Sequence, residues 1–387
     1  MYQEVIDKHF TSLLHDIAQG HKPTGVETHM LVRTLKTDVV QTAIIPITKK
    51  HSAENIVEER MHILQKIWPA FSQWWLQYLK INKVEDIPVD TLWRFYIPLS
   101  QWVVEQKRSL RPDDVYVVGI YGSQGRGKTV TALALVSVLN HLLDQEVDGQ
   151  AVTCSIDDYY LSKARRETLR PLGYDAGPGV SNRGPAGTHD TKWLLRNLHE
   201  FRDSTPASST AVGNFQKQLD DQPQEPRVVY GKVGVFILEG WFVGANTDFD
   251  LRHIPEGFQR TVAQYLQGDY KTIFDRLDAL WAFDTPSVDE ILRNREQQEW
   301  LLEKSQGKRG MSPEQIRSFV RYFYEATWTP GVTSPIPQPK DITFLGTIYP
   351  NRKIGMIERG GRPIARVAPM GSGAPSRGEA VATECDP

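Results

Sequence analysis

The chain has 387 residues, of which 40% are hydrophobic and 24% charged, as is usual for a globular protein. Its 45 Lys and Arg residues against 47 Asp and Glu residues give a formal charge of −2 without blocks of like charge, which argues against a nucleic-acid partner. No stretch approaches the roughly 20 consecutive apolar residues of a membrane-spanning helix, so we expect no membrane association.

The first part of the chain, residues 1–108, has the apolar spacing of helices. Within it, Ile56–Lys80 carries apolar side chains about one helical turn apart, and Pro69 is expected to split or kink this helix. Aromatic residues at this spacing are more often core than a platform for a ligand. We predict an N-terminal helical region that packs on the rest of the protein.

Residues 109–352 alternate short apolar runs with helical segments. Strands are predicted at four places, the last with two alternative positions: 115–121, 151–155, 233–238, and 262–265 or 272–274. A helix is predicted directly after the first strand, from residue 129 to 143. This alternation predicts an α/β fold of three layers, in which helices cover both faces of a mostly parallel sheet.

Three further segments have distinct compositions. Residues 202–231 are polar and without periodicity, which predicts a surface insertion or mobile loop. Residues 286–325 have the pattern of two helices broken at Gly307–Gly310, and they are the candidate for a lid. The tail, residues 366–387, is rich in small and polar residues and is predicted to be disordered.

The cysteine content and the start of the chain bear on its compartment. Cys154 and Cys385 are too few for a disulfide framework or a zinc cluster, and the first ten residues contain no apolar signal segment. We therefore expect a reducing, cytoplasmic location, or the plastid stroma if a transit peptide has been removed. The sequence does not indicate an oligomeric state.

Residues 122–129, GSQGRGKT, match the phosphate-loop pattern between a predicted strand and a predicted helix. Glycines let the backbone N–H groups turn toward phosphate oxygens, and the helix adds its positive end. The lysine is expected to reach the β- and γ-phosphates of ATP, and the threonine hydroxyl to bind Mg²⁺. The predicted nucleotide-binding residues are Gly122, Ser123, Gln124, Gly125, Arg126, Gly127, Lys128 and Thr129. The Arg126 side chain can face solvent.

Acidic residues follow two of the predicted strands. Asp157 and Asp158 come after the strand at 151–155, where one carboxylate can accept a proton from an attacking hydroxyl and the other can hold Mg²⁺ through water. Glu239 ends the strand at 233–238 and is expected to orient a magnesium-bound water. The alternative for each acid is a helix cap. Thr129, Asp157 and Glu239 are thus the predicted metal ligands.

A glycine-rich loop, residues 183–190 with the sequence RGPAGTHD, gathers a cation, a hydroxyl, an imidazole and a carboxylate. Its arginine suits bidentate hydrogen bonding to a carboxylate or phosphate. The histidine is either a substrate contact or an ordinary surface residue. Together with the tyrosine that follows the acid pair, the candidate substrate-binding residues are Tyr160, Arg183, Thr188, His189 and Asp190.

In combination these segments resemble the D-glycerate 3-kinases of the plant, cyanobacterial and fungal type, in the phosphoribulokinase/uridine kinase superfamily of P-loop kinases. The resemblance covers about residues 90–350. The matching segments, in the family's order, are 96–102 (YIPLSQW), the phosphate loop, 157–160 (DDYY), 183–190, 239–244 (EGWFVG), Trp281, 293–299 (RNREQQE) and 310–312. The 183–190 and 239–244 segments are much more specific than the phosphate loop.

The resemblance implies a P-loop NTPase fold and an ATP- and Mg²⁺-dependent phosphorylation of D-glycerate to 3-phosphoglycerate. In plants and cyanobacteria this reaction ends photorespiratory carbon recovery. It also implies that Lys128 acts in catalysis and that Asp157 or Asp158 is the base. Arg183 and His189 would bind the acceptor. Arg293 and Arg295 would close over the phosphates as a lid, the alternative being a solvated helix face.

One segment departs from the family. Relatives usually carry Asp-Lys-Ser followed by Gly-x-Gly-Asp-Arg near residues 200–225, where this chain has Arg202-Asp203-Ser204 and Gly213-Asn214. A substitute cation such as Lys217 or Lys232 would preserve the function. The alternatives are weak activity, a different hydroxyl acceptor such as a nucleoside or another sugar acid, or an ATP-binding regulatory protein without turnover.

Overall fold

The computed structural model describes residues 2–49, 51–80, 83–177, 181–284, 288–306, 311–329, 332–348 and 354–360. The predicted disordered tail, residues 366–387, and the predicted helix break at Gly307–Gly310 lie outside the described residues. None of the helices in the described ranges combines the length and apolar character needed to cross a membrane.

The chain begins with helices, as predicted. Their bounds are α1 Tyr2–Ala18, α2 Gly25–Thr37, α3 Val39–Ile44, α4 Ala53–Leu79, α5 Val89–Thr91 and α6 Ile97–Leu110. Helix α4 continues through Pro69 instead of splitting there, since Trp68, Phe71 and Trp75 on either side of the proline are buried in one core. Tertiary packing outweighs the hydrogen bond that a proline removes.

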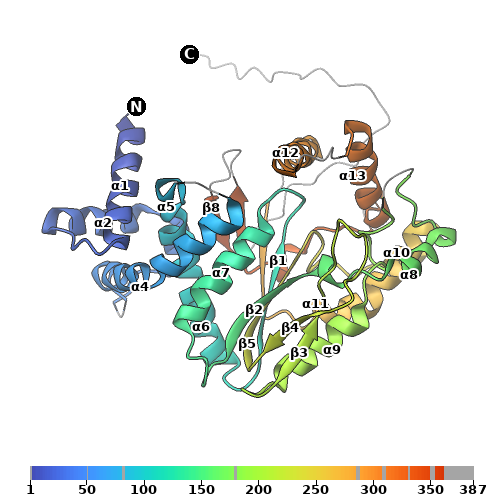
Figure 1. Ribbon diagram of the computed structural model, residues 1–387, viewed down its shortest axis with the longest axis horizontal. Coiled ribbons are helices and arrows are strands. Elements are labelled where there is room, and N and C mark those ends of the chain that lie inside the picture. The colour runs from blue at the N-terminus through green and yellow to red at the C-terminus, as the bar shows by residue number, and fades with distance from the viewer. Residues whose placement is uncertain are drawn as a thin grey trace, which may run out of the picture.

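A six-stranded sheet forms the centre of the molecule (Figure 1). Its strands are β1 Tyr116–Tyr121, β2 Gln150–Ser155, β5 Val233–Gly240, β6 Ala279–Phe283, β7 Phe344–Ile348 and β8 Ile354–Arg359. The spatial order is β2-β5-β1-β6-β7-β8, and every neighbouring pair is parallel except β7 with β8. Every residue of β1 and β5 is buried, as expected for strands covered on both faces.

Helices cover both faces of this sheet and complete the predicted three layers. The later helices are α7 Lys128–Leu142, α8 Lys163–Glu167, α9 Thr191–Arg202, α10 Phe258–Tyr265, α11 Lys271–Phe274, α12 Val288–Gln306 and α13 Pro313–Thr327. One hydrophobic core joins the N-terminal helices to α7 and one face of the sheet. A second core joins the other face to the later helices. Helices α12 and α13 confirm the two helices predicted within 286–325.

Two predictions along the chain are corrected. The strand expected at 262–265 or 272–274 is wrong, because these residues belong to α10 and α11, and the strand is β6 instead. Its sequence, ALWAF, contains no β-branched residue, and a short apolar run has no period that separates strand from helix. Strands β7 and β8 were not predicted.

The polar segment 202–231 is not an unstructured loop. It contains β3 Ser209–Val212 and β4 Arg227–Tyr230, which pair antiparallel as a small separate sheet. Residues 213–222, between these two strands, run back toward the carboxyl ends of β2 and β5, where Phe215 N–H donates to the Asp158 carbonyl oxygen at 3.2 Å. Long-range pairing of this kind leaves no local pattern in the sequence.

Candidate active site

The phosphate loop joins β1 to α7 in the predicted way. Gly125 and Gly127 have φ values of 78° and 75°, a left-handed conformation that favours glycine, and α7 begins at the next residue. The Lys128 ammonium donates to the Ser123 carbonyl oxygen at 3.1 Å, and burial lowers its pKa. The loop therefore presents backbone N–H groups, a helix N-terminus and a cation to one place.

Thr129 and Glu239 meet beside this loop. The Thr129 hydroxyl lies in the first turn of α7 and donates to Glu239 Oε1 at 2.8 Å, because β5, whose second-last residue is Glu239, is the neighbour of β1. No group of three His, Cys, Asp or Glu residues in the described part of the chain forms a metal cage. A hydroxyl and a carboxylate are donors that suit Mg²⁺, which usually keeps several waters and binds substrate phosphates.

The structure separates the two adjacent aspartates, of which Asp157 faces the cavity. Its Oδ1 accepts from the Tyr160 hydroxyl at 2.8 Å, and its Oδ2 pairs with the Lys217 ammonium at 2.9 Å. Burial works against ionisation of Asp157, but the Lys217 charge and the hydrogen bonds from Lys217 and Tyr160 outweigh it and hold the pKa well below its usual range. Asp157 is therefore an ionised carboxylate.

Asp158 has the capping role that the sequence left open. Its Oδ2 accepts from the Ser155 backbone N–H at 2.8 Å, which completes a capping box around the short turn Ile156–Tyr159. Asp158 does not line the cavity, and burial raises the pKa of this carboxyl to about 6. Of the two acids, Asp157 has the placement expected of a catalytic base.

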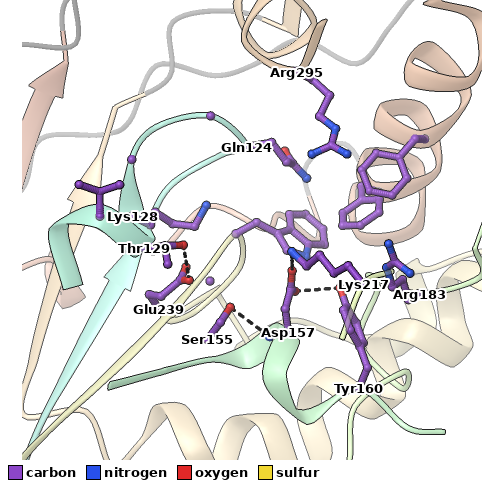
Figure 2. A pocket seen from close by; sticks show the side chains of 17 residues that line it. Gln124, Lys128, Thr129, Ser155, Asp157, Tyr160, Arg183, Lys217, Glu239 and Arg295 are labelled. Carbon is purple, nitrogen blue, oxygen red and sulfur yellow. Dashed lines mark hydrogen bonds and ion pairs between the residues drawn. The ribbon is translucent and has the colours of Figure 1, made fainter. Parts of the chain in front are cut away.

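A cavity of about 260 Å³ lies over the phosphate loop at the carboxyl ends of the strands. Its lining residues are Gln124, Gly125, Gly127, Lys128, Thr129, Val130, Ser155, Asp157, Tyr160, Arg183, Lys217, Glu239, Gly240, Trp241, Arg295, Phe319 and Phe323. Figure 2 shows the Lys128, Thr129 and Glu239 side chains on one side of this cavity and the Arg183, Lys217 and Arg295 side chains on the other.

Two of these cations are held by acids and aromatic rings. Arg183 pairs with Asp220, and its guanidinium lies over the Phe215 ring at 5.6 Å. Arg295, on α12, pairs with Glu299. Its guanidinium lies 5.5 Å from the centre of a ring on α13, that of Phe319. Cations held in this way are set in advance for an anionic ligand.

Lys217 is the cation that the 202–231 segment contributes. Gln222 anchors the same segment by donating to the Asp158 and Tyr160 carbonyl oxygens at 2.8 and 3.0 Å. Lys232, the other cation considered from the sequence, donates instead to the Val147 carbonyl oxygen at 2.8 Å and does not line the cavity.

The 183–190 loop brings only its arginine to the cavity. His189 is buried, stacks on the Tyr160 ring at 4.4 Å, and lies 2.6 Å from the Tyr270 hydroxyl through Nδ1. Burial lowers the pKa of His189 to about 3, so the imidazole is neutral. Thr188 accepts from Gly184 N–H within the loop, and Asp190 caps α9. These three residues shape the loop behind the cavity wall.

Arg126 and Arg293 also lie outside the cavity lining. The Arg126 side chain does not take the solvent-facing position that the sequence allowed, because it is 3% exposed and pairs with Glu290 of α12. Arg293 is exposed on α12, which matches the solvated-face alternative. Gly122 and Ser123, although part of the loop, are buried beneath it and do not line the cavity.

An aromatic wall is the feature that sequence reasoning missed. Trp241, Phe319 and Phe323 line the cavity, and the Trp241 indole donates to the Gly184 carbonyl oxygen at 3.3 Å. A Cβ added at Gly184 would lie 2.1 Å from the Phe323 ring, so this wall and the 183–190 loop are closely packed. The amphipathic spacing of α13 was a signal for a buried face, but not for a face on the cavity.

Sequence comparison finds kinases from two yeasts. The uncharacterized kinase mug58 of Schizosaccharomyces pombe is 27% identical over 249 residues, which are 60% of this chain and 82% of the relative. The probable ATP-dependent kinase TDA10 of Saccharomyces cerevisiae is 29% identical over 222 residues, 51% of this chain and 72% of the relative. No protein-family model matches the chain.

Comparison with solved structures supports the fold. The YGR205w protein superimposes with a TM-score of 0.52 at 21% identity, over 70% of this chain and 98% of that chain. A D-glycerate 3-kinase from Cryptococcus neoformans is also similar, with a TM-score of 0.49 at 22% identity, over 67% of this chain and 97% of that chain. Together with the phosphate loop between β1 and α7, the first of these likenesses confirms the predicted P-loop α/β fold.

Proposed function

We propose that this chain is an ATP-dependent kinase that transfers the γ-phosphoryl group to a hydroxyl of a small anionic acceptor. The observation that carries the proposal is that the phosphate loop and Asp157 line one cavity together with three cations, Arg183, Lys217 and Arg295. The names of the two similar yeast proteins support phosphoryl transfer. A cavity lined by a phosphate loop, a carboxylate and several cations has the groups that phosphoryl transfer needs, since catalysis of that reaction consists mainly of positioning and charge stabilisation.

The ATP side of the site uses the phosphate loop. Lys128 and the loop N–H groups bind the β- and γ-phosphates, and Thr129 and Glu239 would hold Mg²⁺. Bound Mg²⁺ supplies neutralisation of the phosphate charge. Arg295, on the opposite wall, stabilises the charge of the group in transfer.

Asp157 is the base toward the acceptor hydroxyl. In a loose transition state the hydroxyl needs little activation before attack. An ionised carboxylate of low pKa therefore suffices to orient the hydroxyl and take its proton late in the transfer. The Tyr160 hydroxyl, which donates to the other carboxylate oxygen, fixes the carboxylate for this role.

The acceptor that we propose is D-glycerate, with 3-phosphoglycerate as the product. The support is the motif resemblance together with Arg183, whose fork of donors matches a carboxylate. Lys217 supplies a cation from the segment that lacks the family's Asp-Lys-Ser pattern. The departure from that pattern is therefore compatible with the same acceptor.

The test is a coupled ADP-release assay with Mg-ATP and four conditions: D-glycerate, L-glycerate, uridine or no acceptor. Lys128→Ala serves as the inactive control. We expect ADP formation that depends on D-glycerate and is lost in the variant. ADP formation with uridine but not with D-glycerate would show that the acceptor is a nucleoside. ATP binding without acceptor-dependent ADP formation would show that the protein is a regulatory protein and not a kinase.

A further inference from the structure

Arg126 belongs to the phosphate loop, but its side chain does not line the cavity. Gln124, Gly125, Gly127 and Lys128 line the cavity, whereas Arg126 does not. Its Nη1 lies 2.7 Å from Oε1 of Glu290, and the two side chains are 3% and 17% exposed. The partner of the guanidinium is thus an acid in the first turn of α12.

A second contact joins the same two elements. Gly125, which precedes Arg126, lies so close to α12 that an added Cβ would be 2.6 Å from the Asn294 Cβ. Glu290 and Asn294 are four residues apart and therefore lie on one face of the helix. Helix α12 thus contacts the phosphate loop at two neighbouring points. One is the ion pair, and the other is the close approach of Asn294 to the Gly125 backbone, which a side chain at residue 125 would prevent.

These contacts determine the direction of the Arg295 side chain. Ile291, on an adjoining face of α12, is fully buried in the core and limits rotation of the helix. Arg295 follows Asn294 and reaches the cavity, as Figure 2 shows. A change in the depth or rotation of α12 would therefore move the Arg295 guanidinium relative to the phosphate loop.

We propose that Arg126 is a positioning residue that holds α12 on the phosphate loop through Glu290 and so directs Arg295 at the phosphoryl group in transfer. Removing one partner of this ion pair takes away the attraction that it supplies between the phosphate loop and α12, which favours separation of the two elements. A misplacement of about 1 Å at a reacting group is enough to slow catalysis by about 100-fold. This inference rests on the proposed function, since it takes the cavity to be the ATP site.

The kinetic test is a double-mutant cycle with Arg126→Met, Arg295→Met and both together. We expect each single variant to lower kcat roughly 10- to 100-fold. We expect the double variant to stay within about 3-fold of Arg295→Met, since Arg126 acts through Arg295. Glu290→Gln should reproduce the loss of Arg126→Met. Losses that multiply in the double variant, or a Glu290→Gln enzyme with unchanged kcat, would overturn the proposal.

A second measurement needs no turnover. Hydrogen exchange of the amides of residues 288–306 is compared between the wild type, Arg126→Met and Glu290→Gln, all without nucleotide. We expect faster exchange at α12 in both variants and unchanged exchange in Arg252→Met, which breaks an exposed ion pair with Asp250 away from the site. Unchanged exchange in the first two variants would refute the positioning role. If the wild type shows no turnover, the proposed function fails while this measurement still decides the role of Arg126.

Discussion

Replacing each of the two adjacent aspartates by asparagine gives unequal predicted effects. Asp157→Asn removes the carboxylate that lines the cavity between Lys217 and Tyr160. Asp158→Asn leaves a side-chain oxygen that can still accept from the Ser155 N–H, so the cap of the turn is retained. The two variants have nearly the same size and differ by one position, and each is the control of the other.

The expected magnitudes follow from these roles. Loss of a general base lowers kcat by about 100- to 10,000-fold, which corresponds to roughly 3–5 kcal/mol of activation free energy. Below about pH 4, where Asp158 is protonated, Asp158→Asn costs at most about 1 kcal/mol of folding stability through a weaker cap, and the variant leaves kcat within about 3-fold of the wild type. The ratio of kcat between the two variants is therefore expected to exceed about 30.

The assay measures acceptor-dependent ADP release under saturating Mg-ATP, with the thermal unfolding of both variants as a check on folding. We expect Asp157→Asn to be folded and nearly inactive, and Asp158→Asn to be active. An inactive but folded Asp158→Asn beside an active Asp157→Asn would show that the wrong carboxylate has been assigned as the base.

Burial raises the pKa of Asp158 from 3.8 to about 6, so its contribution to stability is present below about pH 4 and lost as the pH rises to 6. As the pH rises through this window, the free energy of unfolding of Asp158→Asn should therefore gain on the order of 3 kcal/mol over that of the wild type. The same pH dependence of unfolding in both proteins would contradict the raised pKa of Asp158. Lys217→Met should raise the pKa of Asp157, and it should raise the KM for the acceptor roughly 10-fold. Lys232→Met should have the acceptor KM of the wild type. Equal acceptor KM values for the two variants would exclude Lys217 from the acceptor site. Thr129→Val should weaken the apparent Mg²⁺ affinity roughly 10-fold, as measured by Mg²⁺ titration of the rate, and an unchanged titration would rule out the hydroxyl as a ligand.

The parts of the fold that the sequence predicted are those with a strong local signal. The strand, glycine loop and helix around residues 116–142 were predicted together, since a buried apolar strand and a phosphate loop each leave a pattern within a few residues. Strand β6 was misplaced because ALWAF has no periodicity. The β3–β4 pair was missed because its partners lie on either side of a polar segment, and pairing across that distance is set by tertiary contacts.

In the candidate site, too, the sequence predicted the residues that have a local signal and missed what depends on tertiary contacts. Lys128, Thr129 and Glu239 follow from chain order and sheet position, since the carboxyl ends of neighbouring parallel strands meet at one edge. Sequence spacing could not separate Asp157 from Asp158, because adjacent residues of a turn point in different directions that only the cap fixes. The burial of Arg126 depends on a partner more than 160 residues away, so no local pattern indicated it.

The most direct test of the central claim is to follow the phosphoryl group itself. In ³¹P NMR spectra of the wild-type enzyme with Mg-ATP and D-glycerate, we expect a new phosphomonoester resonance that matches 3-phosphoglycerate and grows as the γ-phosphate resonance of ATP falls. Lys128→Ala should give neither change. Release of inorganic phosphate alone, or an ATP spectrum unaffected by D-glycerate, would contradict the assignment of this cavity as the site of phosphoryl transfer to that acceptor.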